Sequence, residues 1–102
     1  VQAFDANTLE SLWVYTDSLG GQALSPITYS DGYVYTGFWN SETGKASYAC
    51  IPVTDEDASN TTETQKALWR DAVQGGFYWA GSVVVGDYIV YGTDDISTPA
   101  TS

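Results

Sequence analysis

Short runs of strand-favouring residues alternate with turn-forming residues along this chain of 102 residues. Residues 11–16 read SLWVYT and residues 33–39 read YVYTGFW, and both runs are rich in the β-branched and aromatic types that favour strands. Glycine, aspartate and asparagine stand between such runs, and the Asp31-Gly32 pair is a typical hairpin turn. The pattern therefore predicts many short strands joined by tight turns.

The predicted strands cover residues 1–6, 11–16, 23–29, 33–39, 46–53, 66–72, 78–85 and 88–92. Pro26 falls inside one of them and favours an edge or bulge position, because proline lacks the backbone donor that a central strand needs. A helix over residues 64–72 would be too short and too β-branched at its start. We therefore expect an all-β fold.

An internal repeat narrows the choice among all-β architectures. Leu12-Trp13 recurs as Leu68-Trp69 after 56 residues, Gly20-Gly21 recurs as Gly75-Gly76 after 55, and Tyr33-Val34 with Gly37 recurs as Tyr88-Ile89 with Gly92 after 55. The period is close to that of a four-stranded propeller blade, ~40–50 residues. The polar, acidic segment 54–64 accounts for the extra length, and we expect it to be a solvated loop.

Residues 3–13 resemble the tryptophan-docking repeat of the pyrroloquinoline-quinone-type (quinoprotein-like) β-propellers, A-x-D-x-x-T-G-K-x-x-W. The residues that match are Ala3, Asp5, Thr8 and Trp13, while Leu9 and Glu10 replace the usual glycine and lysine. The second copy keeps Thr64, Lys66 and Trp69 but again lacks the glycine, and its first half, residues 49–51, lacks the aspartate.

The resemblance implies antiparallel four-stranded propeller blades in which each docking tryptophan packs between neighbouring sheets. It also implies that the aspartate and threonine of the repeat close the turn before the tryptophan. The expected division is the outer two strands of one blade in 1–17, a complete blade with a 54–64 loop insertion in 18–73, the inner two strands of the next blade in 74–95, and a disordered tail in 96–102.

Half a blade, a whole blade and half a blade cannot close a propeller, which needs ~4–8 blades. The expected partners are therefore the other blades of the same propeller or other copies of the chain. In the first case the segment is part of a longer chain, and in the second the copies join head to tail. The start at Val1 rather than at methionine favours a processed or excised segment.

Charge excludes some classes of partner. Three Lys and Arg against 13 Asp and Glu give a formal net charge of −10, with no histidine. This balance argues against nucleic acid, whose phosphates require clustered basic residues, and against an anionic membrane surface. No apolar run approaches the ~20 residues of a spanning helix, so we expect no membrane insertion.

The residue types that carry catalysis are sparse. Quinone enzymes of the resembling family use a basic residue, carboxylates with a metal and often adjacent cysteines, whereas this chain has one cysteine, Cys50, and one arginine, Arg70. We therefore expect no cofactor and no catalytic residue, and Cys50 is expected to be a small buried side chain. The acidic runs 55–57 and 94–95 lack the spacing of an EF-hand loop, so no metal site is expected. Asn60-Thr61-Thr62 fits a glycosylation sequon.

Aromatic loop residues form the best candidate for a binding surface. In a propeller, the loops expected over residues 17–22, 39–42 and 75–79 would gather on one face. The candidate binding residues are Trp39, Asn40, Glu42, Phe77, Tyr78 and Trp79. Aromatic rings with a few polar groups suit a carbohydrate or protein ligand, although the same rings could pack between blades instead.

The sequence predicts a non-catalytic β-propeller scaffold or binding segment of an extracytoplasmic or cell-surface protein, located outside the cell, on its surface or in a periplasm. One alternative is a fragment of a quinone-dependent oxidoreductase propeller whose cofactor site lies in other blades. Another is a propeller of an assembly lipoprotein that grips partner peptides.

Overall fold

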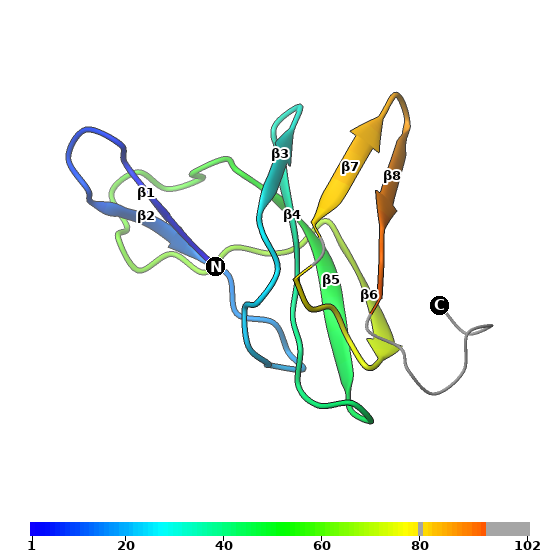
Figure 1. Ribbon diagram of the computed structural model, residues 1–102. Helices are drawn as coiled ribbons and strands as arrows, with labels where there is room; N and C mark the ends of the chain where they lie inside the picture. Colours follow the sequence, from blue (N-terminus) through cyan, green and yellow to red (C-terminus); the bar gives the residue numbers. More distant parts are fainter. Residues whose placement is uncertain (80, 94–102) are drawn as a thin grey trace.

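The computed structural model describes residues 1–79 and 81–93, and every regular element in that part of the chain is a β-strand. The strands are β1 (Gln2–Phe4), β2 (Ser11–Val14), β3 (Thr28–Ser30), β4 (Tyr33–Gly37), β5 (Lys45–Pro52), β6 (Trp69–Gln74), β7 (Ser82–Val85) and β8 (Tyr88–Tyr91) (Figure 1). The expectation of an all-β fold is confirmed. The tail expected over residues 96–102 lies outside the described residues.

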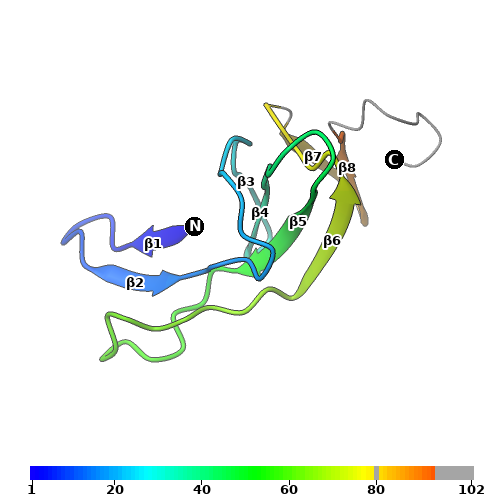
Figure 2. The ribbon, with the colours of Figure 1, turned by 90° about the horizontal axis from the view of Figure 1, so that it is seen from below.

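The strands form three antiparallel sheets of two, four and two strands. The central sheet has the order β3-β4-β5-β6, so that consecutive strands are neighbours, and the β1–β2 and β7–β8 hairpins form the other two sheets. Seen from below, the hairpins stand on opposite sides of the central sheet (Figure 2). No sheet closes into a ring within residues 1–79 and 81–93.

Three predicted strands begin too early. The strand predicted over 23–29 is only β3, and Pro26 precedes it; Gln22 forms an isolated bridge with Trp39 instead. The strand predicted over 66–72 is β6 at Trp69–Gln74, because the segment just before it runs beside β2. There Gln65 N donates to Val14 O at 2.8 Å. The strand predicted over 78–85 is β7 at Ser82–Val85.

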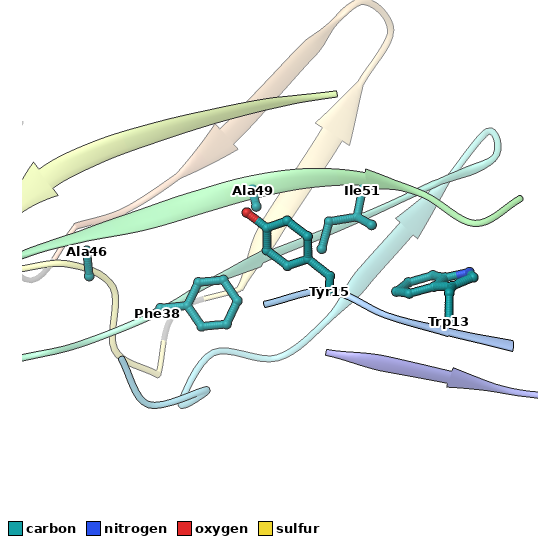
Figure 3. Packing of buried hydrophobic residues seen from close by; sticks show 6 residues of the cluster. All are labelled: Trp13, Tyr15, Phe38, Ala46, Ala49 and Ile51. Atoms are coloured by element: carbon teal, nitrogen blue, oxygen red, sulfur yellow. The ribbon is translucent and has the colours of Figure 1, made fainter. Parts of the chain in front are cut away.

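The main core lies between the β1–β2 hairpin and one face of the central sheet. Its buried members are Trp13, Tyr15, Phe38, Ala46, Ala49 and Ile51 (Figure 3). Trp13 is 2% exposed, and its indole Nε1 donates to Val53 O at 3.1 Å. The expectation that Trp13 fastens one sheet to the next is confirmed, since it packs with Ala49 and Ile51 of β5 and donates to Val53, the residue after β5.

Aromatic rings fill the opposite face of the central sheet, against the β7–β8 hairpin. Tyr48 contacts Phe77 edge-on at a centroid distance of 4.9 Å and Tyr91 at 4.2 Å. Trp69 stacks with Tyr91 at 6.5 Å. Cys50 is 1% exposed on β5, as expected of a small buried side chain, and its burial raises the pKa of the thiol. With both faces covered, β5 is buried almost throughout.

Two glycines allow the chain to pass close to the end of β4. A Cβ on Gly37 would lie 2.5 Å from Phe77 Cβ, and a Cβ on Gly76 would lie 2.7 Å from Phe38 O. Gly76 also has a φ of +62°, a conformation that side chains disfavour. These glycines bring residues 75–77 against the central sheet and so fix where β7 begins.

Candidate functional site

Three loops meet beside the end of β4. Gln22 and Trp39 exchange two backbone hydrogen bonds, with lengths of 2.8 and 3.0 Å. Phe77 N donates to Phe38 O at 2.9 Å, which anchors the segment after β6 to the same place. Asn40 Nδ2 donates to Leu19 O at 3.1 Å. Residues 17–22, 39–42 and 75–79 are therefore joined by backbone contacts.

Three aromatic side chains lie together on these loops, and we call them the aromatic corner: Trp39, Tyr78 and Trp79. Trp39 and Tyr78 meet edge to face at a centroid distance of 5.6 Å, and Tyr78 contacts Trp79 at 4.6 Å. Trp79 is 73% exposed, whereas Trp39 and Tyr78 are partly buried. The exposed ring of Trp79 therefore rests on Tyr78, and Tyr78 in turn rests on Trp39.

The other candidate binding residues have different positions. Phe77 is 1% exposed and packs in the core, so its expected place on a binding surface is corrected: the close approach at Gly37 pulls its ring inward. Asn40 is exposed, but its side-chain Nδ2 already donates to Leu19 O at 3.1 Å and to Lys45 O at 2.8 Å. Glu42 is exposed in the turn that Asn40 braces.

Hydrogen bonds to the side chains of Asp5 and Thr8 close the turn between β1 and β2. Asp5 Oδ1 accepts the backbone N–H groups of Asn7 at 2.8 Å and Thr8 at 2.9 Å, and Thr8 Oγ1 accepts Glu10 N at 3.3 Å. The backbone bonds from Thr8 and Asn7 lower the pKa of Asp5. Leu9 has a φ of +62°, so the chain bends there in a glycine-like conformation. Ala3 pairs with Trp13 across this hairpin.

The second copy of the docking motif is built differently. Thr64 and Lys66 are exposed, and the buried residue between them, Gln65, ties the loop down by donating to Pro52 O at 2.6 Å and Thr54 O at 3.0 Å. Trp69 is only partly buried, unlike Trp13. It does pack toward a neighbouring sheet, because its ring stacks on Tyr91 of β8.

A buried residue with many hydrogen-bond partners, Asp17, was not singled out from the sequence. Its carboxylate is buried and accepts Tyr15 Oη at 2.6 Å, Ser47 Oγ at 2.8 Å, Leu19 N at 3.0 Å and Arg70 Nε at 3.1 Å. Burial acts to raise the pKa of Asp17, but these hydrogen bonds outweigh it and hold the pKa below its ordinary value.

A carboxylate that accepts hydrogen bonds from four residues has little capacity left for proton transfer or for a ligand. The Asp17 cluster is therefore structural: it joins the loop after β2 to β5 and β6. The sequence feature that could have indicated a buried carboxylate partner is the chain's single arginine, Arg70, which stands beside a tryptophan. Nothing in the sequence indicated that Asp17 would be its partner.

The acidic segment does not assemble a metal site. Within residues 1–79 and 81–93, no three Asp, Glu, Cys or His side chains are grouped as a metal ion would require. Residues 94 and 95 lie outside that part of the chain. The pKa of Glu63 is raised, chiefly because the neighbouring carboxyl group of Asp55 favours the protonated form. Asn60 is exposed in a turn, where Oδ1 accepts Thr62 N at 3.0 Å.

Comparisons with protein-family models, with curated proteins and with solved structures found no match to this chain. In the described part of the chain, no helix is long and apolar enough to cross a membrane.

Proposed function

We propose that this chain is a non-catalytic β-propeller segment that serves as a scaffold and binding segment of an extracytoplasmic or cell-surface protein. In this proposal β1–β2 is the outer half of one blade, β3–β6 is a complete blade and β7–β8 is the inner half of the next. The neighbours of the two half blades are other blades of the same propeller or other copies of the chain.

The β1–β2 turn supports the assignment to blades. The docking repeat has glycine where this chain has Leu9, and Leu9 has the positive φ that glycine adopts most readily. The aspartate and threonine of the repeat close the same turn. The consecutive order of β3, β4, β5 and β6 is also the strand order of a propeller blade.

The observation that carries the binding role is the exposure of Trp79 in the aromatic corner. An indole that is 73% exposed contributes apolar surface to water, yet Tyr78 holds it in contact on one side. Such a ring can stack on the apolar face of a sugar, and loops on a rigid sheet are the usual carriers of binding residues. The net charge of −10 favours a neutral ligand over an anionic one. We therefore propose a neutral carbohydrate as the ligand class, with a protein ligand as the alternative outcome.

The test is a titration of the chain with cellohexaose and with chitohexaose, followed by tryptophan fluorescence and calorimetry. We expect at least one of the two sugars to bind, and Trp79→Ala to abolish that binding. The matched control is Leu68→Ala, because Leu68 is also largely exposed, at 61%, but lies outside the aromatic corner. The carbohydrate role is wrong if neither sugar binds or if both variants bind as the unaltered chain does.

A further inference from the structure

Two strands have open edges on their outer sides. Within the described residues β8 pairs only with β7, and β1 pairs only with β2. In the central sheet, by contrast, the chain continues from β4 to β5, and these two strands pair over five residues from Tyr33↔Pro52 to Gly37↔Tyr48. An open strand edge presents unpaired backbone N–H and C=O groups that can accept another strand.

The internal repeat indicates what kind of strand each edge would accept. Tyr88-Ile89 on β8 repeats Tyr33-Val34 on β4, and Leu12-Trp13 on β2 repeats Leu68-Trp69 at the start of β6. The hairpin β7–β8 thus corresponds to β3–β4, and β1–β2 corresponds to β5–β6. In the central sheet β5 pairs with β4, so the strand expected to pair with β8 is one that corresponds to β5, namely β1. The chain's own β1 lies at the opposite end of the molecule from β8 (Figure 1).

Two apolar faces of the chain are also uncovered. On the β7–β8 hairpin the exposed residues are Val83, Val85, Tyr88 and Val90, each 60–76% exposed. On the central sheet, Thr28 Oγ1 donates to Ser82 O of β7, so Tyr29 points to the opposite face because strand side chains alternate. Tyr29 is 64% exposed and the nearby Ile27 is 57% exposed.

The partly buried Trp69 lies beside β8, the strand whose outer edge is open. It lines a groove of about 510 Å³ together with Asp71, Ile89, Val90 and Tyr91. The corresponding Trp13 is 2% exposed, because the end of β5 covers it and accepts its indole N–H. Since β5 corresponds to β1 by the repeat, a β1 strand beside β8 would cover Trp69 in the same way.

We propose that a second copy of this chain docks head to tail, with its β1 paired antiparallel to β8 and its β1–β2 hairpin covering Trp69. This inference rests on the proposed function, because it treats the three sheets as blades. The joined hairpins make one four-stranded sheet, and the uncovered face of β7–β8 packs against Ile27 and Tyr29 of the second copy. The interface is heterologous, so each docked copy presents a further open edge until the assembly closes on itself.

The central sheet also specifies the register between copies. Tyr35 faces Cys50 across β4 and β5, Cys50 faces Trp69, and Ala3 faces Trp13. By the repeat, Val90 takes the place of Tyr35 and Ala3 takes the place of Cys50. Val90 of one copy therefore faces Ala3 of the next. This register is consistent with their sides: Val90 points away from its own central sheet, and Ala3 packs toward that of its copy.

The experiment is disulfide trapping with two chains, both carrying Cys50→Ala, one with Val90→Cys and the other with Ala3→Cys. They are mixed at 0.15 M salt under mild oxidation. The matched control replaces Val90→Cys with Val83→Cys. Val83 is directly paired with Val90 and equally exposed, at 61% against 63%, but lies one strand further from the edge. Neighbouring strands lie ~4.8 Å apart and second neighbours about twice as far, beyond the usual reach of a disulfide.

We expect the Val90→Cys mixture to give about tenfold more linked dimer than the Val83→Cys mixture. The unmodified chain should show an oligomeric mass by light scattering. A monomeric mass with no linked dimer overturns the proposal, and so does equal linking of both mixtures, which would indicate random collision or another register. The sugar titration reports on the aromatic corner, so retained binding in a chain that fails to link would refute the docking and leave the proposed function intact.

Discussion

Arg70 Nε donates to Asp17 Oδ1 at 3.1 Å, although the two residues lie 53 positions apart in the sequence. The carboxylate side chain is fully buried, and the guanidinium side chain is 36% exposed. The pair connects β6 to the loop that follows β2, so it helps to fix the β1–β2 hairpin against the central sheet. A buried charge of this kind is expensive to leave without partners.

The two halves of this ion pair should differ in their contribution to stability. Asp17→Ala leaves the buried hydroxyls of Tyr15 and Ser47 without an acceptor, and we expect it to lower the free energy of unfolding by about 3 kcal/mol. Arg70→Ala removes a partly exposed donor and leaves the other hydrogen bonds to Asp17, so about 1 kcal/mol is expected. Urea unfolding followed by tryptophan fluorescence measures both values. An equal or larger cost for Arg70→Ala would contradict this account.

Acid should destabilise the fold in part through Asp17. Its folded pKa lies below the ordinary value, so its contribution is fully present above the unfolded pKa of about 3.9 and is lost as the pH falls through the folded pKa. We expect the free energy of unfolding to decrease between about pH 5 and pH 2. Asp17→Asn should make this slope shallower. Some slope should remain, because Asp5 and Asp57 also have lowered pKa values. An unchanged slope in Asp17→Asn would show that the carboxylate is not the titrating group.

Leu9→Gly should stabilise the protein. Leu9 has a φ of +62° and is 74% exposed, so its side chain contributes strain and little packing. Left-handed backbone costs a residue with a side chain about 1–2 kcal/mol, and glycine returns part of that gain through its greater freedom when unfolded. A net gain of about 0.5–1 kcal/mol is expected from thermal or urea unfolding. Leu9→Ala is the control and should give no comparable gain, because alanine keeps the strained conformation.

Gly37→Ala and Gly92→Ala form a matched pair, because the two glycines occupy the same place in the repeat. A methyl group on Gly37 would overlap Phe77, whereas nothing lies within 4 Å of the corresponding position on Gly92. We expect Gly37→Ala to cost about 2–3 kcal/mol and Gly92→Ala less than about 0.5 kcal/mol. Urea unfolding in dilute solution tests both variants. Similar costs at the two sites would mean that the contact between β4 and Phe77 is not tight.

Strand existence was predictable, but strand starts were not. Alternating β-branched and aromatic residues located every strand, because that pattern reflects burial on one face of a sheet. The errors fell where a segment bonds to something other than its expected partner. Gln65 hydrogen-bonds to β2, so β6 begins only at Trp69. Gln22 pairs with Trp39 instead of extending β3, which is therefore only three residues long. Such choices depend on distant backbone groups that no local pattern records.

The candidate surface was corrected in detail. The three loops meet beside the end of β4, whereas their gathering on one face of a propeller stays a prediction. Phe77 and Trp79 have similar residue types and stand two positions apart, yet one is 1% and the other 73% exposed. Their difference follows from Gly37 and Gly76, whose missing side chains admit Phe77 to the core. The sequence identified the aromatic residues of these loops but did not distinguish the buried ones from the exposed ones.

The sequence by itself determined the all-β class and the spacing of the repeat, because these follow from residue type and periodicity, whereas the packing of Trp13 between sheets was expected only from the resemblance. Only the tertiary structure decided that the Asp17 carboxylate accepts hydrogen bonds from four residues, that Phe77 turns inward and that Trp69 is only partly buried. Each of these depends on which groups from distant segments come within a few ångströms, and such distances are set by the packing of whole sheets. Local residue preferences determine where strands form, and the packing of distant segments determines the contacts of each side chain.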